Sequence, residues 1–202
     1  MLNIAVLVSG GGTNLQAILD AIRDGRIEDA RIVLVISSNA GAYALSRAAA
    51  HGIPVLVAGQ SEFPRAADRS AAIVSALRGA GADLIVLAGY MHILDPKVVR
   101  AFAGRIINIH PSLIPKYCGR GFYGKRVHRA VLAAGERESG ATVHYVDEGV
   151  DTGPVILQER VPVCADDDAD SLAARVLKAE HRILVRAVNR VAKEMKREDG
   201  KA

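Results

Sequence analysis

The most informative segment of the sequence is Ile106-Ile107-Asn108-Ile109-His110-Pro111-Ser112-Leu113-Ile114-Pro115. Three of its first five residues are isoleucines, and β-branched side chains favour a strand. Side chains alternate along a strand, so Asn108 and His110 share one face, and Pro111 ends the ladder because it has no N–H to donate. The stretch therefore predicts a strand that presents an amide and an imidazole side by side at its carboxyl end. Such a pair could bind a ligand, or it could only cap the strand.

Apolar β-branched runs and helical patterns alternate on both sides of this stretch. We expect strands at 3–8, 31–37, 54–57, 84–88, 106–110, 142–146 and 155–163, and helices at 14–24, 42–51, 65–80, 95–102, 127–134 and 169–196. Alternation through the first hundred residues predicts βαβ units, whereas the closer spacing afterwards leaves room for an antiparallel hairpin. The sequence thus predicts an α/β fold, an open, mostly parallel twisted sheet of about seven strands with helices on both faces. We expect a single domain over 1–196 and a polar tail over 197–202.

The composition of the 202 residues is that of an ordinary globular protein, with 50% hydrophobic and 24% charged side chains. The two cysteines, Cys118 and Cys164, match no metal or redox spacing, which favours free thiols in a reducing cytosol. The N-terminus reads as a strand rather than a signal peptide, and no apolar run reaches the length of a membrane helix. A net charge of +4 suits a small anionic substrate better than nucleic acid. We therefore expect a cytoplasmic protein, a monomer or homodimer, with no metal, no membrane partner and no nucleic acid.

The first loop, Ser9-Gly10-Gly11-Gly12-Thr13-Asn14, lies between a predicted strand and a predicted helix. Glycines let the backbone approach a ligand, and free N–H groups at a helix N-terminus attract phosphate. The loop lacks the glycine spacing of a dinucleotide fingerprint and the Gly-Lys-Ser/Thr of a Walker loop. It therefore indicates either a site for one phosphate or a tight turn with a helix cap.

Two later loops follow predicted strands and have similar alternatives. Residues 88–96 include Met91, His92, Ile93 and Leu94, which could line a flat pocket for a heterocycle or form a buried connection. Residues 146–154 contain three carboxylates within five positions, at Asp147, Glu148 and Asp151. Such a loop is either a solvated turn or a means of directing one carboxylate at an imidazole.

Glu180 interrupts the apolar face of the last predicted helix, which also carries Leu172, Val176, Ile183, Leu184, Ala187 and Val191. Burying a carboxylate is costly unless it is paired. Glu180 therefore either meets a basic group of the protein or holds a cationic or N–H-donating ligand.

Taken together, these motifs resemble the phosphoribosylglycinamide formyltransferase family, the folate-dependent enzymes of purine synthesis. The matching stretches are 9–15, 87–94, 108–116, 142–144, 151–156 and Glu180-His181. Asn-x-His-Pro-Ser-Leu with a downstream Asp-x-Gly is shared by other users of formyltetrahydrofolate, whereas Ser-Gly-Gly-Gly-Thr-Asn-Leu at 9–15 is more discriminating. Related enzymes that act on methionyl-tRNA or hydrolyse the folate carry an additional domain, for which we expect no room here.

The resemblance implies transfer of a formyl group from 10-formyltetrahydrofolate to the amine of glycinamide ribonucleotide. It implies Asn108, His110 and Asp151 as the catalytic trio, with Asp151 raising the pKa of His110. Phosphate binding by Gly12, Thr13 and Asn14, in a phosphate-binding half at 1–100, is implied as well, with Glu180 at the glycinamide end. The folate would bind in the half at 101–196 together with residues of the first half, at Arg65, Met91, His92, Ile93, Leu94 and Asn108.

Two departures from the family pattern and two other functions remain open. The segment 118–125 is longer than the corresponding segment in many relatives, and it could be either a mobile lid or a plain surface loop. Leu177 stands where some relatives have glutamine. Hydrolysis of formyltetrahydrofolate would use nearly the same site but would need neither the phosphate loop nor Glu180. A non-catalytic folate- or nucleotide-binding regulator would be expected to have a broken trio.

Overall fold

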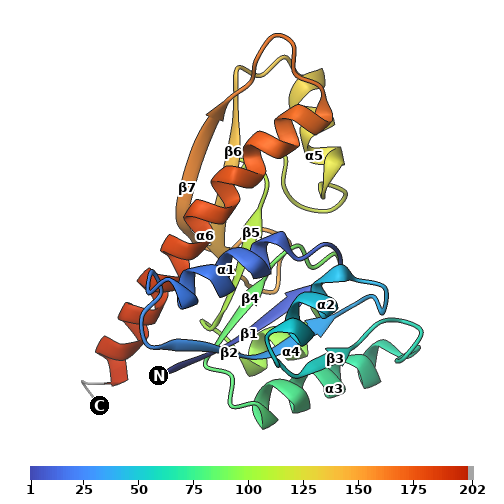
Figure 1. The fold of residues 1–202 in the computed structure, drawn as a ribbon. Coiled ribbons are helices and arrows are strands. Elements are labelled where there is room, and N and C mark those ends of the chain that lie inside the picture. Colours follow the sequence, from blue (N-terminus) through green and yellow to red (C-terminus); the bar gives the residue numbers. More distant parts are fainter. Residues whose placement is uncertain (200–202) are drawn as a thin grey trace.

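Seven strands form one sheet in a computed structural model of the chain, which describes residues 1–199 (Figure 1). The strands run in the order β3-β2-β1-β4-β5-β6-β7. Neighbouring strands from β3 to β5 in this order are parallel, whereas β6 is antiparallel to β5 and β7 is antiparallel to β6. Their bounds are β1 (Leu2–Val8), β2 (Ala30–Ser37), β3 (Val55–Val57), β4 (Leu84–Leu87), β5 (Ile106–His110), β6 (Glu138–Tyr145) and β7 (Val155–Pro162). The predicted open, mostly parallel α/β sheet is confirmed, together with its antiparallel hairpin.

Helices cover both faces of the sheet, because successive side chains of a buried parallel strand point to opposite sides. In β1, Ile4 and Val6 pack into the core under α1, α2 and α6, whereas Ala5 and Leu7 pack into the core under α3 and α4. The helix bounds are α1 (Thr13–Arg23), α2 (Tyr43–Ala50), α3 (Ala66–Gly79), α4 (Pro96–Ala101), α5 (Lys125–Ala133) and α6 (Ala169–Asp199).

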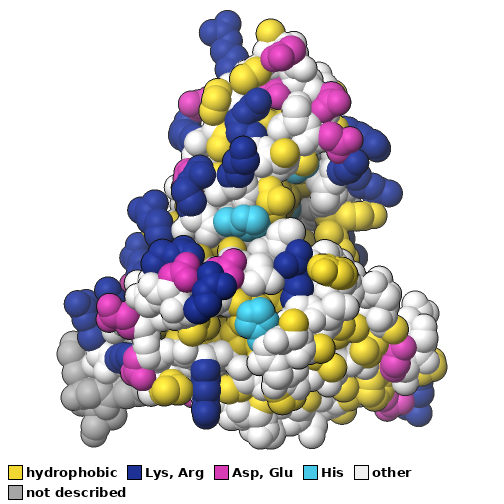
Figure 2. Space-filling view, in the orientation of Figure 1, with side chains coloured by type: hydrophobic (Ala, Val, Ile, Leu, Met, Phe, Trp, Pro, Cys, Tyr) yellow, Lys and Arg dark blue, Asp and Glu magenta, His cyan; other side chains and the backbone are white. Residues whose placement is uncertain are grey.

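The β6–β7 hairpin, α5 and the first half of α6 extend beyond the rest of the molecule (Figure 1). On the face drawn in Figure 2, basic side chains cover much of this extension, interspersed with acidic ones. Within residues 1–199, no helix is both long and apolar enough to cross a membrane.

Two element boundaries differ from the sequence-based prediction by more than two residues. Strand β6 begins at Glu138 rather than at 142, because the turn-like Ser139-Gly140 pairs with Val161 and Arg160 of β7. Gly140 fits there because a Cβ atom would collide with the backbone of Glu159. Helix α6 continues to Asp199, so the predicted polar tail begins as helix, and its last residues, 200–202, lie outside the described part of the chain.

The topology determines where a ligand can bind. The chain moves outward from β1 through β2 to β3, then returns to the other side of β1 for β4 and β5. In such sheets the loops at the carboxyl ends of the strands separate at this switch point and leave a crevice. The loops after β1 and β4 and the carboxyl end of β5, which the sequence marks as functional, all lie at this edge.

Candidate active site

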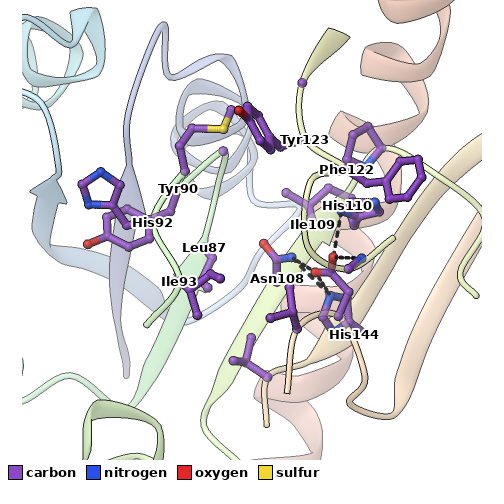
Figure 3. A pocket seen from close by; sticks show the side chains of 18 of the residues that line it. Leu87, Tyr90, His92, Ile93, Asn108, Ile109, His110, Phe122, Tyr123 and His144 are labelled. Atoms are coloured by element: carbon purple, nitrogen blue, oxygen red, sulfur yellow. Dashed lines mark hydrogen bonds and ion pairs between the residues drawn. The ribbon is translucent and has the colours of Figure 1, made fainter. Parts of the chain in front are cut away.

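A cavity of about 440 Å³ opens at the carboxyl ends of β4 and β5. Figure 3 shows Tyr90, His92 and Ile93 on one wall and Asn108, His110 and His144 on the opposite wall. The first wall is the loop after β4, and the second is the end of β5 with its neighbour β6. The cavity is also lined by Asp147, Gly149, Val150 and Asp151, by Gly119 and residues 121–125, and by Ala173, Ala174, Leu177 and Glu180 of α6.

Four polar side chains converge on one wall of this cavity. The Asp151 carboxylate lies 3.6 Å from His110 Nδ1 and 3.5 Å from His144 Nε2. Asn108 Nδ2 lies 3.4 Å from Asp151 Oδ1 and 3.2 Å from His144 Nε2. His110 and His144 are 5% and 2% exposed, so the cluster is shielded from bulk water on the protein side.

Two backbone carbonyls fix the tautomers of the two imidazoles, since a carbonyl can only accept a hydrogen bond. His110 Nε2 donates to Tyr117 O at 2.9 Å, so Nδ1 is the nitrogen that faces Asp151. His144 Nδ1 donates to Tyr145 O at 2.8 Å, so Nε2 is the nitrogen that faces Asn108. Both histidines therefore present a defined nitrogen to the cluster.

His110 differs from the expectation in one respect. Burial lowers its pKa, and this effect outweighs the raising effect of the Asp151 carboxylate. Asp151 thus raises the pKa of His110 as predicted, but burial lowers it by more. The sequence indicated the carboxylate, but it could not show how completely the imidazole is enclosed. His110 is consequently neutral at rest.

Asp151 is the one carboxylate of its loop that turns toward the imidazoles. Asp147 instead accepts from Gly149 N and from Thr152 Oγ1, and Glu148 pairs with Arg100. Burial raises the pKa of Asp151, but the neighbouring His144 and His110 imidazoles and the Gly119 N–H together bring it below its usual value. Asp151 is therefore ionised beside a neutral His110.

His144 is a member of the cluster that the sequence analysis did not assign. Strand β6 pairs with β5 so that His144 lies opposite Asn108 and Thr142 lies opposite His110. Thr142 Oγ1 donates to Ser112 O at 2.6 Å, which holds the chain that leaves β5. The two-residue alternation of Thr142 and His144 was visible in the sequence, but the pairing of β6 with β5 was not.

Glu180 has no basic partner within residues 1–199; it accepts a 2.7 Å hydrogen bond from Asn14 Nδ2. Both side chains are buried, at 9% and 7% exposure, and burial raises the pKa of Glu180. Of the two alternatives for this residue, the basic protein partner is therefore excluded. Glu180 lines the cavity, and through Asn14 it joins the cavity to the start of α1.

The glycine loop leads from β1 to this junction. Gly12 precedes α1 with φ of 71°, and a Cβ atom there would collide with Ala44 of α2. The first helical hydrogen bond runs from Gln16 N to Gly12 O, so the N–H groups of Thr13 and Asn14 remain free for an anion. Gly12 and Thr13 lie beside the main cavity rather than in its wall.

The 118–125 segment forms part of the cavity wall. Gly119 N donates to Asp151 Oδ2 at 2.9 Å, and Phe122 packs edge-on against Tyr117. Lys125 Nζ pairs with Asp170 of α6 at 2.5 Å. The segment is thus joined to the Asp151 carboxylate at one end and to α6 at the other.

Comparison with known proteins identifies the family to which the chain is similar. The formyl transferase family matches residues 2–188. The chain is 46% identical over 183 residues to the phosphoribosylglycinamide formyltransferase of Haemophilus influenzae, covering 91% of this chain and 84% of that protein. The glycinamide ribonucleotide transformylase 1 structure from Symbiobacterium toebii has 44% identity and a TM-score of 0.87, covering 94% of this chain and 86% of that one.

The chain belongs to the phosphoribosylglycinamide formyltransferase family. It is also 49% identical over 186 residues to the trifunctional purine biosynthetic protein adenosine-3 of Drosophila melanogaster, of which it spans 13%. The formyltransferase fold thus occurs both as a chain of about this length and as one part of a much longer protein.

The formyltransferase cavity contains most of the predicted site residues: Met91, His92, Ile93, Leu94, Asn108, His110, Asp151 and Glu180. Arg65 lies outside its wall, at the start of α3, where the exposed guanidinium is 3.6 Å from Asp68. Its folate contact stays a prediction. Within residues 1–199, no group of three or more His, Cys, Asp or Glu side chains could hold a metal ion.

Proposed function

We propose that this chain transfers the formyl group of 10-formyltetrahydrofolate to the amine of N1-(5-phosphoribosyl)glycinamide, a step of purine synthesis. The observation that carries the proposal is the position of the Asn108, His110 and Asp151 cluster. The cluster lies in one cavity, between a wall formed by residues 89–94 and the buried Glu180. Glu180 is hydrogen-bonded to Asn14, next to the glycine loop that precedes α1. A flat heterocycle fits the wall, and a phosphorylated amine fits the side of Glu180.

The donor would bind along residues 89–94, where backbone N–H and carbonyl groups can recognise a pterin-like ring. The acceptor phosphate would bind the free N–H groups at the start of α1, where the helix dipole favours an anion. Glu180 would accept hydrogen bonds from the acceptor, which would give its buried carboxylate a second partner. The two substrates then meet at Asn108 and His110.

The reaction joins the amine nitrogen to the formyl carbon. The acceptor loses a proton, its lone pair attacks, and negative charge develops on the formyl oxygen as a tetrahedral centre forms. The bond to the folate nitrogen then breaks, and that nitrogen receives a proton. The enzyme must therefore stabilise an oxyanion and move a proton between two nitrogens.

His110 is suited to the proton transfer. It is neutral at rest because burial lowers its pKa, and Nδ1 lies 3.6 Å from Asp151, beyond hydrogen-bond distance. Nδ1 can take the proton of the attacking amine, and the imidazolium that forms stands beside an ionised carboxylate. Asp151 thus acts on the charged intermediate rather than on the resting histidine.

Asn108 is suited to stabilising the oxyanion. Its amide donates at 3.2 Å to His144 and at 3.4 Å to Asp151. The longer contact is the weaker one, and the formyl oxygen would replace it, while His144 continues to hold the amide. One oxyanion donor of this kind typically lowers a barrier by about 3–4 kcal/mol.

The direct test is turnover of 10-formyltetrahydrofolate by the purified protein, followed by absorbance, with and without N1-(5-phosphoribosyl)glycinamide. We expect tetrahydrofolate to form only when the ribonucleotide is present, together with an equal amount of formylated ribonucleotide. Turnover without the ribonucleotide would support the hydrolase instead. Tight binding of both compounds without turnover would support a binding protein.

A further inference from the structure

Ser9 links three loops at the carboxyl edge of the sheet. It ends the β1 segment, and its Oγ lies 2.6 Å from Ser38 Oγ, just after β2. Met91 N, in the loop after β4, donates to the same Ser9 Oγ at 2.8 Å. Because Ser9 accepts from Met91, its own hydroxyl proton is available for Ser38. The hydroxyl therefore spans the switch-point crevice between β1 and β4.

The bond to Ser9 is the principal attachment of the loop after β4. Within residues 1–199, the backbone of residues 89–94 makes no other hydrogen bond to protein. All six of these residues line the cavity, and Met91 and Ile93 are 53% and 59% exposed. Removing the Ser9 hydroxyl would leave the donor wall without a fixed backbone contact.

The other side of Ser9 is the glycine loop, which is held from behind. Ala44 N donates to Gly10 O at 3.1 Å, and Arg47 Nε donates to Gly11 O at 2.9 Å. These bonds occupy carbonyls and leave the loop N–H groups for an anion. An anion bound there would restrict the backbone at Gly10, and hence the position of Ser9.

We infer that Ser9 is a positioning residue that couples the two substrate sites, so that each substrate raises the affinity for the other. The inference rests on the proposed function. A phosphate on the glycine loop fixes Ser9, and Ser9 fixes Met91, so the donor binds a wall that is already ordered. A ligand that need not order its own site binds more tightly. The effect is reciprocal, because coupling between two binding equilibria is symmetric.

The test is the affinity for tetrahydrofolate, measured by calorimetry with and without saturating N1-(5-phosphoribosyl)glycinamide, a pair that cannot react. In the unaltered protein we expect the ribonucleotide to tighten tetrahydrofolate binding by about fivefold or more. In Ser9→Ala the ratio should fall to about one, while the affinity for the ribonucleotide alone stays within a few-fold. A merely structural role would weaken binding without changing this ratio.

Three further variants make the test specific. Ser9→Cys keeps nearly the same volume but is a weak acceptor, so it should behave like Ser9→Ala. Ser9→Thr keeps the hydroxyl and should retain the coupling. Ser38→Ala removes the second hydroxyl but leaves the bond to Met91, and most of the coupling should survive.

An equal ratio in the unaltered protein and in Ser9→Ala would overturn the coupling, even if the enzyme turns over normally. Loss of coupling in Ser38→Ala alone would assign it to the other hydroxyl and also overturn the role of Ser9. Failure of the unaltered protein to bind the ribonucleotide would instead contradict the proposed function.

Discussion

Replacing Asp151 by asparagine should remove most of the activity while leaving the fold intact. The carboxylate is 12% exposed and lies 3.6 Å from His110 Nδ1. Two unit charges at that distance attract by about 4–5 kcal/mol at an effective dielectric constant of about 20. Asparagine loses this attraction for the imidazolium but can still accept from Gly119 N. Since about 1.4 kcal/mol corresponds to a tenfold rate, kcat/KM should fall by about a thousandfold.

The backbone makes Asp151→Asn a clean test, because residue 151 has φ of 59° and asparagine tolerates the left-handed region. The assay is the initial rate of tetrahydrofolate formation at varied concentrations of both substrates. Glu148→Gln is the matched control, since Glu148 pairs with Arg100 at the surface and is absent from the cavity wall. It should keep full activity. An Asp151→Asn protein with more than a tenth of the normal kcat/KM would refute the electrostatic argument.

Three further predictions follow from the geometry of the site. His144→Ala should lower kcat by about 10–100-fold with little change in KM, because Asn108 loses the partner that orients it; unchanged kcat in steady-state rates would contradict this. Glu180→Gln should raise the melting temperature at pH 7–8 by about 2–4 °C, since it removes a buried charge whose partner is an amide rather than a basic group. The same change should weaken acceptor binding. A lower melting temperature would contradict the destabilising effect of this buried carboxylate. Burial lowers the pKa of His110 and His128 below the unfolded value of about 6.5, so the unfolded chain binds more protons. The contribution of these two histidines to stability should therefore be complete above that pH and decline as the pH falls below it; denaturant titrations that show no loss between pH 7 and 5 would contradict this.

Local patterns in the sequence were sufficient to predict the strands and helices and the polar pair at the end of β5. The isoleucines of β5 and the alternation of Asn108 and His110 determine a strand and its polar face, because both depend only on neighbouring residues. The three glycines before Thr13 likewise indicate a loop and a helix start. Such features need no knowledge of the partners across the sheet.

Features that depend on distant partners could not be predicted in the same way. The position of His144 opposite Asn108 requires the β5–β6 register, and the Asn14–Glu180 bond joins residues at opposite ends of the chain. The direction in which the pKa of His110 shifts depends on how deeply the imidazole is buried, which the sequence does not show. The opposing effect of the Asp151 carboxylate could be predicted from the sequence. The partner and the burial, rather than the residue type, decided these cases.

The length of α6 has a consequence for how the chain folds during synthesis. The helix has 31 residues, so it is about 46 Å long, and its apolar side chains fill the layer that β1, α1 and β6 leave open. Until this last helix has been made, one side of the sheet would be covered only in part. The nascent chain would then expose Ile4, Val6 and their neighbours to solvent and to other chains. Formation of the native state therefore has to await the synthesis of α6, and until then the exposed apolar face is a target for chaperones and for aggregation.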